Sequence, residues 1–179
     1  MKRIAAAAVL GALSLLALAG CKSMTTEELK GTMEITDIET KWVMKYYQPW
    51  PPRLILVPQL SFRVKNIGTQ PLTFVNFNGV YNFKGEAENF GDCFLSAIRG
   101  KAVPVGEKSD VITLKSNLGV DGKNLANIRD NPAWKTAEVR LFARSKGSQF
   151  VLLGIYDVSR YIDFKEPEPL APKQEGIKK

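Results

Sequence analysis

Alternating apolar and polar side chains recur along most of the chain, most clearly at residues 54–66. A period of two is typical of a β-strand that buries one face. Pro58 interrupts the run and predicts an edge position or a β-bulge, because proline cannot donate to a strand ladder. The apolar face consists of Leu56, Leu60, Phe62 and Val64, and the polar face consists of Gln59, Ser61, Arg63 and Lys65.

Six further segments have strand character and are separated by turn residues. A long first strand is expected at 34–47, where Trp42, Met44 and Tyr46 alternate with Val43 and Lys45. A helix is the weaker alternative there, because β-branched residues favour strands. The other strands are expected at 72–83, 90–98, 111–114, 136–144 and 149–158. Seven short strands at this spacing predict an all-β, two-sheet sandwich.

Three segments interrupt the strand pattern. Residues 48–53 contain three prolines and predict a loop. Residues 116–133 form one long insert, in which 124–129 could make a single helical turn that Pro132 ends. Residues 165–179 are charged and proline-rich, which predicts a disordered tail.

Two motifs within the strand region carry a family resemblance. They are FRVKNIGTQPL at 62–72 and VPVGEKSDVITL at 103–114. This pair resembles the immunoglobulin-like domains of bacterial surface lipoproteins and of the water-stress (LEA14-like) family, in which a strand ends in Asn-x-Gly and a Pro-x-Gly-Glu turn precedes a later strand. The resemblance implies an immunoglobulin-like β-sandwich of about seven strands with one long loop insert. It implies little about function, because such domains serve many roles.

The N-terminus has the features of an export signal. Lys2 and Arg3 precede an apolar run at 4–19. This run is shorter than the roughly 20 residues that span a bilayer, and its flanks are those of a secretory signal. It ends in Leu18-Ala19-Gly20-Cys21, which resembles the lipobox of bacterial lipoproteins. The alternative is an ordinary signal with a chance cysteine.

The resemblance to lipoproteins implies cleavage before Cys21 and acylation of its thiol. Two or three acyl chains would hold the protein in its leaflet, because each buried methylene contributes about 0.8 kcal/mol. Lys22 follows where lipoproteins retained in the inner membrane often carry Asp, so the resemblance favours the periplasmic face of an outer membrane. No cofactor is expected.

The expected organisation is a signal peptide at 1–20, a lipidated tether at 21–33, a β-sandwich domain at 34–164 and the tail at 165–179. Cleavage removes Lys2 and Arg3 and lowers the formal net charge from +7 to +5. Such an excess suits anionic head groups or is simply a solvated surface. A nucleic acid partner is not expected, because export removes the protein from it.

The sequence lacks the residues of the common catalytic sites. It contains no histidine, which excludes Ser-His and Cys-His nucleophile activation. Once Cys21 is acylated, Cys93 has no partner for an internal disulfide, and we expect it to be a small buried apolar residue. The carboxylates lack the spacing of a calcium loop, so neither a metal site nor catalytic residues are predicted. They are Glu86, Glu88 and Asp92, followed by Asp121 and Asp130.

Residues 42–53, WVMKYYQPWPPR, form the most unusual stretch. Trp, Tyr and Arg are enriched at binding hot spots, and a proline-rigid loop loses little entropy on docking. We interpret Tyr47, Trp50 and Arg53 as candidate partner-binding residues, with Trp42 and Tyr46 in the core. The competing interpretation folds Trp50 over the sandwich end. Trp134 is predicted to plug an end of the sandwich.

These observations favour a lipid-anchored, non-enzymatic protein of the cell envelope. Acylated Cys21 would attach it to the membrane, and it would bind a protein partner as an accessory or scaffold subunit. The alternative is a lipid- or glycan-binding lipoprotein of an assembly or transport system, which an apolar cavity between the sheets would favour.

Overall fold

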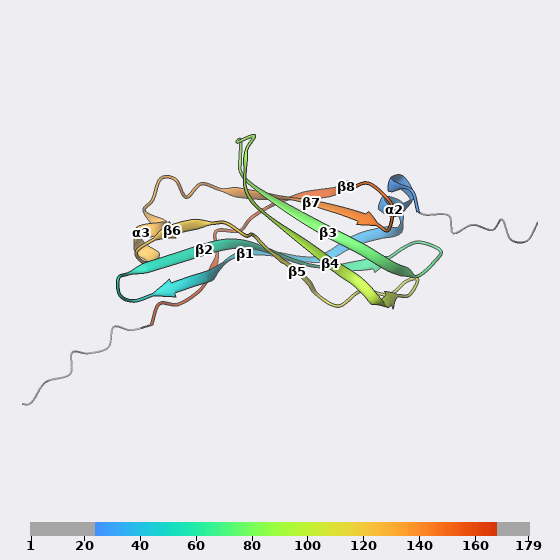
Figure 1. Ribbon diagram of the computed structural model, residues 1–179, viewed down its shortest axis with the longest axis horizontal. Coiled ribbons are helices and arrows are strands. Elements are labelled where there is room, and N and C mark those ends of the chain that lie inside the picture. Colours follow the sequence, from blue (N-terminus) through green and yellow to red (C-terminus); the bar gives the residue numbers. More distant parts are fainter. Residues whose placement is uncertain (1–23, 168–179) are drawn as a thin grey trace, which may run out of the picture.

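The computed structural model describes residues 24–167, which form two packed β-sheets (Figure 1). The signal peptide, the lipobox and residues 168–179 of the tail lie outside the described residues. The elements in chain order are α2 (Thr26–Thr32), β1 (Met33–Gln48), β2 (Arg53–Asn66), β3 (Leu72–Phe83), β4 (Asn89–Val103), β5 (Ile112–Lys115), β6 (Val120–Gly122), α3 (Leu125–Arg129), β7 (Ala137–Ser145), β8 (Val151–Asp157) and β9 (Ile162–Asp163).

The strand order confirms the predicted immunoglobulin-like sandwich. One sheet has the order β5-β2-β1-β9, with β6 also paired to β2, and the other has the order β4-β3-β7-β8. Seven strands have four residues or more, and the other two, β6 and β9, have three and two. Named A, B, C, C′, E, F and G in chain order, the seven form sheets E-B-A and C′-C-F-G. This is an immunoglobulin-like arrangement without a D strand.

Strand β2 is central in its sheet, although Pro58 predicted an edge or a bulge. Pro58 faces Trp42 of β1. The backbone N–H of Trp42 points away from β2 and donates to the Tyr161 carbonyl at 2.8 Å, so Pro58 and Trp42 form a non-hydrogen-bonded pair that needs no N–H from Pro58. On its other side β2 pairs with β6 up to Leu56 and with β5 from Gln59. The missing N–H therefore falls where one neighbouring strand replaces another. Proline is tolerated where the ladder needs no N–H.

Apolar side chains from both sheets fill the space between them. Phe62 and Phe77 meet edge to face across the core, with ring centroids 5.2 Å apart. The predicted inward face of β2 is confirmed. The outward Gln59 and Ser61 are also buried, because β1 and β5 flank them; Gln59 donates to Ser61, whose hydroxyl lies 3.1 Å from that of Thr113.

The two turn motifs noted in the sequence meet at Asn66. Its side chain donates to the carbonyls of Gln70 and Val103, both at 2.9 Å, and accepts from the N–H of Gly68. Its carbonyl accepts from Gly106, which has a positive φ of 82° that suits glycine. The fully buried Asn66 thus joins the β2–β3 turn to the β4–β5 turn.

Residues 26–32 form a helix within the folded domain, whereas the sequence suggested a tether through residue 33. Thr25 and Glu28 form a capping box at the start of α2. Leu29 is only 1% exposed and packs into the core, so the helix closes one end of the sandwich. The seven residues of α2 contain a single large apolar side chain, Leu29, which is too little to indicate a packed helix from the sequence.

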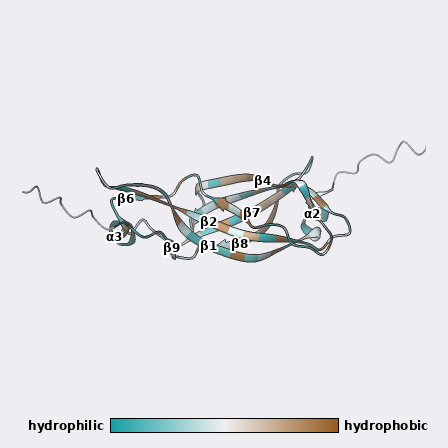
Figure 2. Ribbon diagram, turned by 90° about the horizontal axis from the view of Figure 1, so that it is seen from below, coloured by the Kyte–Doolittle hydropathy of each residue, from teal (hydrophilic) through white to brown (hydrophobic). Residues whose placement is uncertain are grey.

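The molecule is elongated, with different elements at its two ends. Figures 1 and 2 place α2 at one end and α3 with β6 at the other. Strand β1 starts directly after α2 and has 16 residues, so it extends about 50 Å at about 3.3 Å per residue. The β1–β2 hairpin loop therefore lies at the end opposite α2, which we call the distal end.

Candidate functional site

The β1–β2 hairpin loop, residues 49–52, is exposed at the distal end. Trp50 is 84% exposed, so it does not fold over the sandwich. The Tyr46 hydroxyl bonds the Gln48 side chain, whose amide nitrogen donates to the Trp50 carbonyl at 2.9 Å. These bonds and three prolines fix the loop while leaving the indole in solvent.

A β-bulge reverses the expected positions of the two tyrosines. Met44 faces Leu56 and Tyr46 faces Ile55, so Lys45 is an extra residue in β1. Tyr47 consequently lies on the same face as the buried Leu54 and packs on Phe164, with ring centroids 5.5 Å apart. Tyr46 is 41% exposed instead. Tyr47, a candidate contact residue, is thus half-buried, and Tyr46, expected in the core, reaches the surface.

Arg53 is held in place at the start of β2. Its guanidinium bonds Asp121 of β6 through Nε at 3.0 Å and a terminal nitrogen at 2.7 Å. This hydrogen bond raises the pKa of Arg53. The same guanidinium lies 5.9 Å from the centroid of the Tyr46 ring. Tyr46, Arg53 and Asp121 therefore form one exposed group beside Trp50.

The predicted insert supplies the rest of the distal end. Asn124 caps α3, and the helix ends before Pro132 as expected. Strand β6 was not expected, because Val120–Gly122 is too short to show a period. Leu125 donates its N–H to Glu166 at 3.0 Å, which brings the start of the predicted tail against α3.

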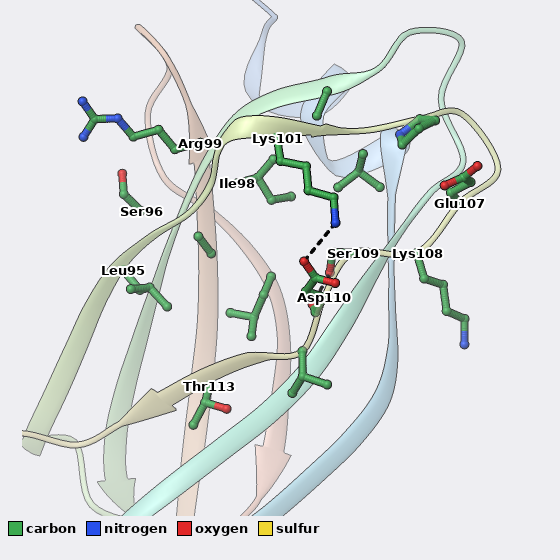
Figure 3. Close-up of a pocket in the computed structure, with 16 residues that line it drawn as sticks. Leu95, Ser96, Ile98, Arg99, Lys101, Glu107, Lys108, Ser109, Asp110 and Thr113 are labelled. Atoms are coloured by element: carbon green, nitrogen blue, oxygen red, sulfur yellow. Dashed lines mark hydrogen bonds and ion pairs between the residues drawn. The ribbon is translucent and has the colours of Figure 1, made fainter.

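A second feature is a cleft between β4 and β5, the open edges of the two sheets. Its volume is about 430 Å³, and its walls include Leu95 and Ile98 from β4, and Val111 and Ile112 from the other side. Lys101 reaches across its mouth to Asp110, at 3.3 Å (Figure 3).

The remaining candidate chemistry is dispersed. Lys135 pairs with Glu86 at 2.5 Å, and Asn117 donates to Asp92 at 2.7 Å. Cys93 carries a free thiol and is half-buried rather than fully buried. Within residues 24–167, no three Asp, Glu or Cys side chains gather as metal ligands would. No helix of this part of the chain is long and apolar enough to cross a bilayer.

Trp134 is buried, as predicted, and meets Trp42 edge to face at 5.9 Å. Arg160 lies over the Trp134 ring, 4.4 Å from its centroid, and donates to the Trp134 carbonyl at 3.3 Å. Trp134 therefore belongs to the core and not to the exposed distal surface.

Comparisons with known proteins identify no family for this chain. No family model matches the chain, and no curated protein matches it. Among solved structures, it is similar to a protein named ApaA from Bordetella pertussis, at 10% identity and a TM-score of 0.38, covering 72% of this chain and 93% of that one. It is also similar to a structural-genomics target solved by X-ray crystallography, at 6% identity and a TM-score of 0.43, covering 80% and 99%. A third is the ligand-binding region of serine-glutamate repeat protein A of Enterococcus faecium, at 11% identity and a TM-score of 0.35, covering 74% and 98%.

Proposed function

We propose that this protein is a lipid-anchored, non-enzymatic lipoprotein of the cell envelope that binds a protein partner through its distal end. Acylated Cys21 attaches it to the membrane, on the periplasmic face of the outer membrane. The observation that carries the proposal is Trp50, an indole 84% exposed on a proline-rich loop whose backbone is fixed by hydrogen bonds. An exposed, preorganised aromatic is the kind of side chain that anchors protein interfaces.

The shape of the domain supports this arrangement. The described chain begins beside α2, and the hairpin lies about 50 Å away along β1, at about 3.3 Å per residue. An anchor at residue 21 would leave Trp50, Tyr46 and Arg53 far from the point of attachment. A partner could then reach them without displacing the anchor.

The binding role is tested with Trp50→Ala in the full chain. A central aromatic anchor costs about 2 kcal/mol or more on truncation, which is about thirtyfold in affinity. An exposed loop side chain costs folding only about 0.5 kcal/mol. Partner co-purification from detergent-solubilised membranes should therefore fall while the melting temperature stays unchanged. Tyr161→Ala, which removes an exposed aromatic outside the hairpin, is the matched control. Unchanged co-purification with Trp50→Ala would refute the distal binding site.

The anchor is tested with Cys21→Ser. A serine hydroxyl is a far poorer nucleophile than a thiolate, so the variant should accumulate as unacylated precursor. Mass spectrometry of the membrane fraction measures this directly. A mature, acylated Cys21→Ser species would overturn the lipoprotein proposal.

The cleft between β4 and β5 favours a second candidate, binding of a lipid or a glycan. Its lining combines apolar residues from both sheets with polar and charged ones, and its volume of about 430 Å³ lies in the range of small-molecule sites. A fluorescent fatty acid tests this second candidate. Saturable binding that Ala97→Trp abolishes would support lipid binding in the cleft, and the absence of binding would refute the fatty acid as its ligand.

A further inference from the structure

The outer surface of the four-stranded sheet exposes phenylalanines among cations at its α2 end. Phe94 is 54% exposed, and Phe74 and Phe150 are exposed as well. Arg99 is paired across the strands with Phe74, and Figure 3 shows it pointing away from the β4–β5 cleft. Isolated exposed apolar residues are ordinary, whereas a contiguous group marks an interaction site. We define the aromatic–basic face as Phe74, Phe94, Arg99, Arg144, Lys146 and Phe150.

Arg144 lies at the centre of this face. Its guanidinium is 4.7 Å from the centroid of Phe150 and 5.7 Å from that of Phe94, and the two rings are 6.4 Å apart. Two aromatic contacts hold the planar group. A guanidinium held in this way can still use its N–H donors to bind an oxyanion.

The cations of this face are not neutralised within the protein. Arg99, Arg144 and Lys146 form no ion pair with any residue between 24 and 167, whereas two cations farther from α2 on the same sheet do. On the same sheet Arg140 pairs with Glu138 at 3.2 Å, and Lys84 pairs with Asp157 at 2.9 Å. The positive charge is therefore concentrated at the α2 end of the sheet, and it is complementary to an anionic partner.

The described chain begins beside this same face. Met24 lines an apolar groove of about 570 Å³ together with Phe74 and Lys146. Cys21 precedes Met24 by three residues, which span at most about 11 Å when extended. An acylated Cys21 would consequently enter the membrane next to the aromatic–basic face.

We propose that the aromatic–basic face docks on the anionic phospholipid surface that holds the anchor. This inference rests on the proposed acylation of Cys21. The phenylalanine rings enter the boundary between head groups and acyl chains, and Arg99, Arg144 and Lys146 bind phosphate groups. One side of the sandwich then lies on the membrane, and the distal hairpin, which belongs to the other sheet, stays accessible to a partner.

The experiment uses the full chain, purified from membranes and reconstituted in vesicles. A fluorophore is attached at Leu152→Cys, on the same sheet face opposite Phe142, in a Cys93→Ala background. The reference label is at Lys123→Cys, at the distal end. Brominated phospholipid quenches only labels near the bilayer. Vesicles of phosphatidylcholine with phosphatidylglycerol are compared with phosphatidylcholine alone, and mass spectrometry records the state of Cys21.

Docking predicts that brominated phospholipid quenches the label at position 152 strongly and the label at position 123 only weakly. The Arg144→Glu variant should lose this difference in quenching between the two labels. Lys123→Glu, which makes the same change in charge at the distal end, should leave the quenching intact. High salt should weaken the quenching, because the Debye length falls from about 10 Å at 0.1 M to about 3 Å at 1 M and charges farther apart than this are screened.

Equal quenching of both labels in an acylated protein would overturn docking and leave the anchor intact. An unacylated Cys21 would refute the anchor. Docking would then stand only if the chain still sediments with anionic vesicles and the Arg144→Glu variant does not. If Arg144→Glu abolishes partner co-purification but leaves quenching unchanged, the face binds an acidic protein and the membrane proposal fails.

Discussion

The hydroxyl of Tyr81 donates to the carbonyl of Leu114 at 2.7 Å, and this bond joins the two sheets. Tyr81 lies on β3 and is fully buried, and Leu114 lies on β5 in the opposite sheet. Tyr81→Phe removes the donor and leaves a buried carbonyl with one partner fewer. We expect the free energy of unfolding to fall by about 1–2 kcal/mol, measured by urea denaturation. A change within experimental error would mean that this bond contributes nothing to the sandwich.

The same tyrosine predicts a loss of stability at alkaline pH. Burial raises the pKa of Tyr81 above the usual tyrosine value of about 10, so the phenol stays protonated in the folded state when the unfolded chain ionises. The stabilisation is complete below pH 10 and is lost as the pH rises toward the folded-state pKa. Tyr81→Phe should therefore flatten the decline in melting temperature above pH 10. An identical decline in both proteins would assign it to other groups.

Trp134 predicts different effects for two substitutions. Its ring packs on Trp42, and its buried indole N–H has no acceptor among residues 24–167. Trp134→Phe removes that unpaired donor together with some packing, so we expect a loss below about 1.5 kcal/mol. Trp134→Ala leaves a cavity and should cost about 3–5 kcal/mol. Denaturation curves of the two variants give the comparison, and equal losses would contradict it.

Leu29 tests whether α2 belongs to the folded unit. Its side chain is 1% exposed, so Leu29→Ala should lower the free energy of unfolding by about 2–5 kcal/mol. Lys30→Ala, on the exposed side of the same helix, should change it by less than about 0.5 kcal/mol. If both variants melt like the parent protein, α2 is a tether after all.

Gly119 should not tolerate a side chain. A Cβ at this position would lie 1.9 Å from the carbonyl oxygen of Leu56, and backbone on β2 cannot yield like a flexible side chain. Gly119→Ala should therefore displace the insert from β2 and destabilise the fold by about 1–3 kcal/mol. Gly85→Ala is the control. Gly85 lies in a turn with open space around it, and its positive φ of 85° penalises alanine without any steric contact. The control therefore shows the effect of backbone strain alone, without the clash expected at Gly119. Hydrogen exchange at Val120–Gly122 should increase only in the Gly119 variant.

The sequence by itself determined the strands and their inward faces. Leu56, Leu60, Phe62 and Val64 alternate with polar residues, and burial of one face of a strand requires that alternation. The β3 boundaries and the single turn of α3 were also predictable, because turn residues and Pro132 limit them locally. The prolines predicted a loop around Trp50, but the sequence left open whether its indole is exposed or folded over the sandwich.

Only the tertiary structure decided which neighbours each strand acquired. Pro58 lies in a central strand because β6 gives way to β5 beside it, and no local pattern records that exchange. The bulge at Lys45 turned Tyr47 inward and Tyr46 outward, since one extra residue reverses every later side chain. The aromatic–basic face likewise unites Phe94 of β4, Arg144 of β7 and Phe150, which directly precedes β8. Cross-strand pairing brings them together, and pairing is set by the packing of the whole sandwich rather than by the sequence near each residue.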